Sequence, residues 1–175
     1  MSKRAAEPGT VHMICGATGA GKTTYATALA QKLPALCLTL DEWMGRLYWP
    51  DAVPGESEEW EMVRIDRCLS QMRSVMLQVI PLGVSAVVDA QFTTRRERES
   101  FGGWAEEQGW QVTLRWIDAE FDTRWARILS RNAQGGGGTG IIVTRPMFER
   151  VEEAWQPPEA DEMARWWGRR VVVEE

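Results

Sequence analysis

Residues 16–23 read Gly-Ala-Thr-Gly-Ala-Gly-Lys-Thr and lie between an apolar run, residues 11–15, and a helix-favouring run, residues 25–33. A strand, a glycine-rich turn and a helix in this order fit the P-loop pattern of Gly, four residues, Gly, Lys and Ser or Thr. Glycines let consecutive backbone N–H groups curve around a phosphate, and the helix N-terminus adds to the attraction. The segment predicts a nucleoside-triphosphate site; the alternative is a glycine-rich turn with a solvated lysine.

The loop and the start of the following helix are expected to bind the phosphates together. Lys22 is expected to neutralise the β- and γ-phosphates, and Thr23 to hold Mg²⁺. The full set of predicted nucleotide-binding positions in this segment is Gly16, Thr18, Gly19, Ala20, Gly21, Lys22, Thr23 and Thr24.

Composition limits the range of partners. The chain has 175 residues, so one domain is expected, with residues 1–10 flexible. Its net charge of −5 gives no general attraction to nucleic acid or to anionic membranes. No apolar stretch reaches the length of a membrane span, and the N-terminus lacks an apolar signal core, which favours the cytoplasm. The three cysteines have spacings that fit neither zinc nor a disulfide framework, and buried reduced thiols are expected.

Strand and helix patterns alternate along the chain. Apolar runs predict strands at residues 11–15, 35–40, 84–89, 111–117 and 170–173. Between them, apolar residues at helical spacing predict helices, one of which starts with the capping-box pair Thr94 and Glu97. This order favours an α/β fold with a parallel sheet covered by helices on both faces.

Asp89 ends the third predicted strand, where a carboxylate beside a P-loop can hold Mg²⁺. Its alternative is a capping or turn aspartate. ATPases that move other molecules usually carry a glutamate next, but here the neighbour is Ala90. This favours phosphoryl transfer over hydrolysis, and Gln91 is the only support for a water-orienting residue.

Asp41 follows the second predicted strand, at the sheet edge where ligands of open α/β sheets bind. A carboxylate there can accept the proton of an acceptor hydroxyl; the alternative is a solvated loop acid. Trp43, Tyr48 and Trp49 are expected in the same loop, either as a stacking platform or as packing over the core.

Arginines are the candidates for binding the negative charge of the phosphoryl group. Arg124, Arg127 and Arg131 step by three and four, which predicts one helix face opposite Phe121 and Trp125. The glycine run at residues 135–138 follows this helix and suggests a mobile lid. Arg127 and Arg131 are the candidates for stabilising the transferring phosphoryl group. A second basic group, at residues 95–98, is expected to be mainly a solvated face.

Five features together resemble one family. They are the P-loop, residues 40–43, residues 87–90, the run from Arg127 to Asn132, and residues 157–159. They look like the small P-loop kinases of the zeta-toxin, chloramphenicol phosphotransferase and polynucleotide 5′-kinase group, whose bacterial members are often labelled AAA-family ATP-binding proteins. The resemblance implies five parallel strands, an arginine-bearing lid, ATP with Mg²⁺, Asp41 as base, and Pro157 near the adenine.

The resemblance also bears on the acceptor. Polynucleotide kinases carry an arginine three residues after the base, and this chain has Met44 there. A small-molecule hydroxyl is therefore expected ahead of a nucleic-acid 5′-hydroxyl or a nucleotide-sugar. A nucleotide hydrolase and a nucleotide-binding regulatory protein remain the alternatives to a kinase, and no pattern indicates an oligomeric state.

Overall fold

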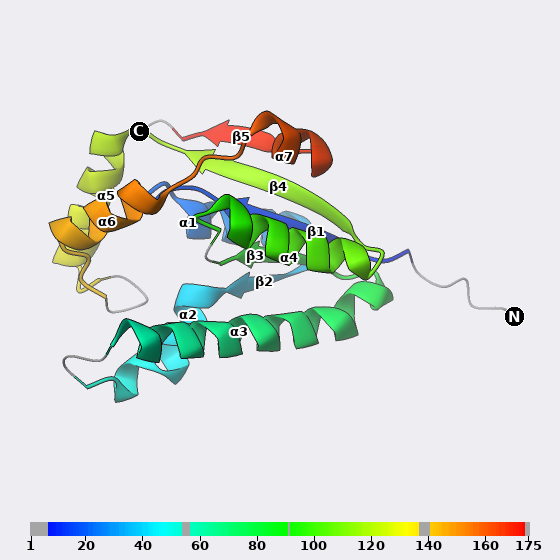
Figure 1. Cartoon of the computed structure of the whole chain (residues 1–175), viewed down its shortest axis with the longest axis horizontal. Coiled ribbons are helices and arrows are strands. Elements are labelled where there is room, and N and C mark those ends of the chain that lie inside the picture. The colour runs from blue at the N-terminus through cyan, green and yellow to red at the C-terminus, as the bar shows by residue number, and fades with distance from the viewer. Residues whose placement is uncertain (1–6, 54–56, 91, 137–140, 174–175) are drawn as a thin grey trace, which may run out of the picture.

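The computed structural model describes residues 7–53, 57–90, 92–136 and 141–173 (Figure 1). The strands are β1 (Thr10–Cys15), β2 (Ala35–Thr39), β3 (Ser85–Asp89), β4 (Gln111–Asp118) and β5 (Arg169–Val172). They form one sheet in the order β2-β3-β1-β4-β5, and every neighbouring pair is parallel. The predicted α/β fold with a five-stranded parallel sheet is confirmed.

Helices connect the strands. They are α1 (Lys22–Lys32), α2 (Leu40–Leu47), α3 (Glu58–Val79), α4 (Arg95–Glu107), α5 (Phe121–Ala133), α6 (Arg145–Ala154) and α7 (Ala160–Arg165), with short 3-10 helices η1 (Trp49–Asp51) and η2 (Ile80–Leu82). The capping box that starts α4 is present as predicted, with the Thr94 and Glu97 side chains bonded to each other's backbone N–H groups. Within the described ranges, no helix combines the length and the apolar character needed to cross a membrane.

The core lies on both faces of the sheet because neighbouring residues of a strand point to opposite sides. In β1, Val11, Met13 and Cys15 join a large cluster with α2, α3 and α4, whereas Ile14 joins a smaller cluster with α1. A central strand covered on both faces needs a continuous apolar sequence. This explains the continuous apolar run at residues 11–15 from which β1 was predicted. Helices cover both faces of the sheet, as expected.

Two expected boundaries were wrong. The flexible N-terminal segment does not extend through residue 10, because Thr10 begins β1 and the Gly9 N–H donates to the Ile80 carbonyl at 2.9 Å. The loop expected after β2 is helix α2, since Leu40 and Met44 are buried one turn apart and Asp41 lies in the first turn, where an acid stabilises the helix dipole.

Candidate functional site

The P-loop is shaped by close contact with the backbone of β4 and α5. A Cβ atom on Gly16 would lie 2.3 Å from the Ile117 carbonyl oxygen, and one on Gly19 would lie 2.6 Å from that of Arg124. Only glycine fits at these two positions. Helix α1 then begins at Lys22, three residues before the run that predicted it, so its N-terminus faces the loop. The segment therefore has the backbone form that phosphate binding requires.

Lys22 and Thr23 are the first two residues of α1, directly after the loop. The Lys22 Nζ donates to the carbonyl oxygens of Gly16 at 2.9 Å and Ala17 at 3.2 Å. The Thr23 hydroxyl donates to Asp89 Oδ2 at 2.6 Å, which joins α1 to the end of β3. Sequence reasoning expected both residues beside a nucleotide, and the structure brings them to one place.

Asp89 is a buried carboxylate at the carboxyl end of β3. Burial raises the pKa of Asp89, the Lys22 charge and the Thr23 hydrogen bond oppose this shift, and the nearby Asp41 charge adds to it. A raised pKa means that the ionised form is incompletely compensated by the protein. A bound cation would supply the missing positive charge beside the Asp89 carboxylate.

The residues present fit Mg²⁺ bound together with a nucleotide. Thr23 and Asp89 supply two neighbouring oxygen ligands, and the described residues contain no cluster of three or more acidic, histidine or cysteine side chains that could hold a metal by itself. Mg²⁺ keeps several waters and is usually held by one or two protein oxygens plus substrate phosphates. The ion would therefore depend on the nucleotide for the rest of its ligands.

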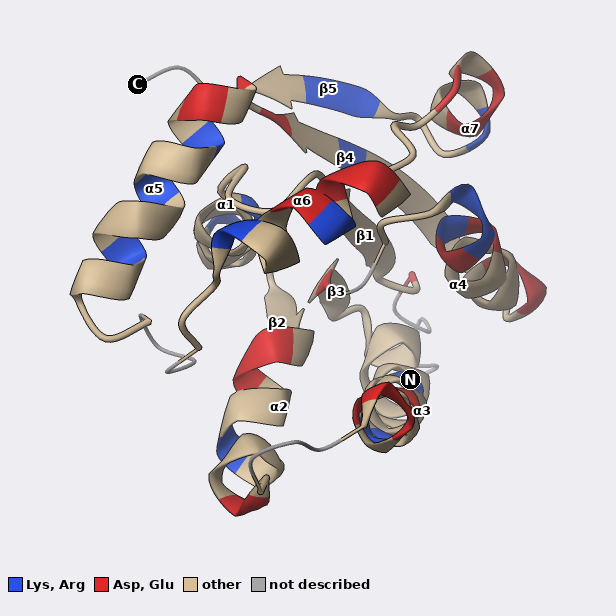
Figure 2. Cartoon of the chain, turned by 60° about the vertical axis from the view of Figure 1, so that its left-hand side comes forward, with Lys and Arg blue, Asp and Glu red and all other residues tan. Residues whose placement is uncertain are grey.

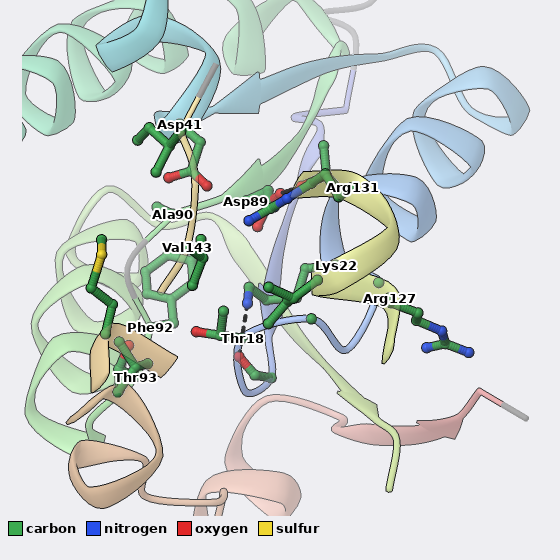
Figure 3. A pocket seen from close by; sticks show the side chains of 18 of the residues that line it. Thr18, Lys22, Asp41, Asp89, Ala90, Phe92, Thr93, Arg127, Arg131 and Val143 are labelled. Carbon is green, nitrogen blue, oxygen red and sulfur yellow. Dashed lines mark hydrogen bonds between the residues drawn. The ribbon is translucent and has the colours of Figure 1, made fainter. Parts of the chain in front are cut away.

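A cavity of about 590 Å³ opens above the P-loop (Figure 3). Its lining includes Lys22, Thr24, Asp41, Asp89 and Arg131. Asp41 enters from the first turn of α2 and points toward the group formed by Asp89 and Arg131 (Figure 3). Residues from four separate elements of the chain thus meet at the carboxyl ends of the strands, where ligands of such sheets bind.

The three arginines of α5 have different positions. Arg131 points into the cavity beside Asp89 (Figure 3), and its Nε is buried without a hydrogen-bond partner among the described residues. Arg127 also lines the cavity and donates to the Ala20 carbonyl at 3.4 Å, but its guanidinium points away from Asp89 (Figure 3). The expected shared face is wrong for Arg124, whose guanidinium lies 5.5 Å from the Phe121 ring centroid.

Arg124 was not predicted as a structural residue. It is buried and donates to Glu152 with both terminal nitrogens, at 2.7 and 2.8 Å. It also donates to the Ala119 carbonyl at 3.0 Å and to the Thr18 carbonyl in the P-loop at 3.3 Å. Arg124 therefore ties the phosphate loop to α6. Its helical spacing could not show this, because the partners lie elsewhere in the chain.

Asn132 holds the segment that follows the glycine run. Its side-chain amide donates to the Val143 carbonyl at 2.8 Å and accepts from the Val143 N–H at 3.1 Å. Val143 lines the cavity, so this double contact fixes one wall of the cavity to the end of α5. The predicted lid glycines at 137 and 138 lie outside the described residues.

The remaining predicted residues are placed as follows. Ala20, within the loop, is fully buried and does not line the cavity. Pro157 does not line the P-loop cavity; it lines a second hollow with Arg95, Trp116 and Trp155. Its proximity to adenine stays a prediction. Gln91 lies outside the described residues. Of the three predicted aromatic residues, Trp49 lines the cavity, and all three pack against the core, as the packing alternative expected.

Comparisons with known proteins agree with this geometry. The fold and loop are those of a P-loop nucleotide-binding domain, and a family profile described as an AAA domain matches residues 11–158. The chain belongs to that family. No curated protein sequence matches the chain significantly.

Three solved structures share the fold. A candidate kinase from Chloroflexus aurantiacus superposes with a TM-score of 0.67 at 20% identity, covering 95% of this chain and 88% of that one. The Mycobacterium tuberculosis APS kinase CysC, in complex with AMPPNP and APS, gives 0.62 at 17%, covering 96% and 90%. A sugar kinase from Janibacter sp. gives 0.62 at 17%, covering 94% and 85%. The expected likeness to small P-loop kinases is confirmed at the level of the fold.

Proposed function

We propose that this protein transfers the γ-phosphoryl group of ATP to a hydroxyl group of a small molecule. The observation that carries the proposal is the convergence of Lys22, Asp89, Asp41 and Arg131 in one cavity above a P-loop. These are the parts that phosphoryl transfer needs: a phosphate cradle, a metal ligand, a base and a cation for the transferring group. The kinase names of the structural neighbours support the same reading.

Each residue has a role in the transfer. The acceptor oxygen forms a bond to the γ-phosphorus, the bond to the β–γ bridging oxygen breaks, and ADP leaves. Asp41 accepts the hydroxyl proton, Lys22 and the loop amides hold the phosphates, and Arg131 stabilises the equatorial charge. Mg²⁺ held by Thr23 and Asp89 would neutralise part of the phosphate charge.

The neighbourhood of Asp89 supports transfer rather than hydrolysis. Ala90 lines the cavity, at the position where a water-polarising glutamate would stand in many ATPases. Its methyl group can neither accept a proton nor orient water. We therefore expect little ADP formation without an acceptor. Rapid acceptor-independent turnover would favour a hydrolase.

The substitution Asp41→Asn tests the proposed base. It removes the proton acceptor and keeps the side-chain shape, so transfer should fall about 10²- to 10⁴-fold. Binding of a non-hydrolysable ATP analogue, measured by calorimetry, should stay close to that of the parent protein. Glu42→Gln is the matched control, because Glu42 pairs with Arg46 at the surface. Equal transfer rates in Asp41→Asn and Glu42→Gln would remove Asp41 from this role.

A further inference from the structure

The charged side chains that line the cavity come from different elements. Among the described residues, the cationic side chains of the lining are Lys22, Arg127 and Arg131, which come from α1 and α5. The carboxylates away from the P-loop are Asp41 on α2 and Glu61 on α3. Figure 2 shows basic bands along α5 and acidic bands at the starts of α2 and α3.

The basic residue of α2 and the first basic residue of α3 are engaged elsewhere. Arg46 pairs with Glu42 at 2.9 Å on the outer side of α2. Arg64 stacks 3.6 Å from the Trp60 ring centroid and donates to the Trp60 carbonyl. Neither arginine lines the cavity. The stretches 54–56, 91 and 137–140, which the structure does not describe, contain no Lys or Arg.

The cavity lining also has apolar and aromatic members, which include Trp49, Phe92, Val143 and Met147. An acceptor with a phosphate or carboxylate beside α2 and α3 would approach Asp41 and Glu61, and among the described residues these two helices contribute no cationic side chain to the lining, so the contact would be unfavourable. A positive group would instead be attracted by Glu61, and the face of Trp49 can interact favourably with a cation.

From these observations we infer that the acceptor is an amine-bearing alcohol with an apolar body, whose ammonium group is bound by Glu61 and Trp49. The inference rests on the proposed phosphoryl transfer and names its substrate class. The hydroxyl group would face Asp41 while the amine lies toward α3. Arg131 would be left for the transferring phosphoryl group. The cavity volume, about 590 Å³, is in the range of small-ligand pockets and must also receive the phosphates.

The test uses acceptors matched in shape and different in charge. Panels of hydroxylated compounds would include 2-amino-1-phenylethanol, its N-acetyl derivative and mandelate as cationic, neutral and anionic members. Transfer from ATP is followed by phosphomonoester formation in ³¹P spectra, and binding by thermal shift with a non-hydrolysable ATP analogue. We expect kcat/KM to be at least about tenfold higher for amines than for their acetamides, and lowest for carboxylates, because only the amine makes an attractive charge contact with Glu61.

The substitution Glu61→Gln should reduce the preference for amines over acetamides by about tenfold, because it removes the charge and keeps the shape. Glu58→Gln is the control, since Glu58 lies in the same first turn of α3 and does not line the cavity. Calorimetry with the ATP analogue verifies that each variant is folded. A preference for anionic or neutral acceptors, or an unchanged preference in Glu61→Gln, would overturn this inference alone. Transfer to no alcohol of any charge would overturn the proposed function itself.

Discussion

At the scale of single residues, Arg131 is unusual because it is incompletely bonded. Its Nε is buried and lacks a partner among the described residues, and a buried unpaired donor costs about 1–3 kcal/mol. The neighbouring Arg124 has both terminal nitrogens bonded to Glu152 and serves as a scaffold. An arginine whose Nε has no partner among the described residues and which points into a cavity is suited to an anion that arrives with the substrate.

We therefore predict that Arg131→Lys lowers kcat by about 10³-fold or more with little change in the affinity for an ATP analogue. The ammonium group keeps the charge but loses the planar, multidentate donor geometry. Single-turnover kinetics with a saturating acceptor would measure the chemical step. Arg127→Lys is the comparison, and a smaller loss is expected because its guanidinium points away from Asp89 (Figure 3). Similar losses in both variants would contradict this division of roles.

At the scale of elements, β1 contains a titratable group in the middle of the sheet. His12 is the single histidine of the chain, and its Nδ1 lies 2.8 Å from the Thr113 hydroxyl of β4. Burial, with a further contribution from the Arg115 charge, lowers the pKa of His12 to about 4. Between this value and the ordinary pKa near 6.5, the unfolded chain binds more protons than the folded protein.

Consequently, the contribution of His12 to stability is present above about pH 6.5 and is lost as the pH falls toward 4. At about 1.4 kcal/mol per pKa unit, the loss reaches about 3 kcal/mol. His12→Gln keeps a polar partner for Thr113 and removes the titration. Urea unfolding at several pH values should show a shallower decline for this variant than for the parent protein. Parallel declines would show that other groups cause the pH dependence.

At the scale of the whole molecule, a buried ion pair joins the cavity wall to the C-terminal elements. Arg98 and Glu162 are almost fully buried and bond at 2.7 and 3.0 Å. Arg98 also donates to the Phe92 carbonyl at 3.2 Å and the Gln156 carbonyl at 2.8 Å. The pair therefore holds α4, α7 and the cavity-lining Phe92 in one arrangement.

Arg98→Met should lower the free energy of unfolding by about 3–5 kcal/mol, because it leaves the Glu162 charge buried and unpaired. Adding Glu162→Leu should recover much of this loss, since it removes the unpaired charge. Denaturant unfolding of both single variants and the double variant gives the coupling energy. Arg46→Met, in an exposed pair, should cost less than about 1 kcal/mol. A double variant that is as unstable as the sum of the single variants would contradict the pairing argument.

Local patterns in the sequence were sufficient to predict the elements and the phosphate loop. The segment from β1 through Gly19 to Lys22 requires a particular backbone conformation over a few consecutive residues. The strands contain alternating or continuous apolar residues, according to whether one or both of their faces are buried. The end of β3 at Asp89 and the capping box at Thr94 are equally local. Such features depend on neighbours along the chain, which is why sequence alone determined the α/β fold class and the loop.

Tertiary structure decided which polar side chains meet. The Arg124 contact to Thr18 spans 106 positions of sequence, and the Arg98 contact to Glu162 spans 64, so periodicity placed these arginines on helices without revealing their partners. The segment after β2 forms helix α2 because Leu40 and Met44 pack into the core. Such partners come together only when the strands pair and the helices pack. A local sequence pattern does not show which distant residues will come into contact.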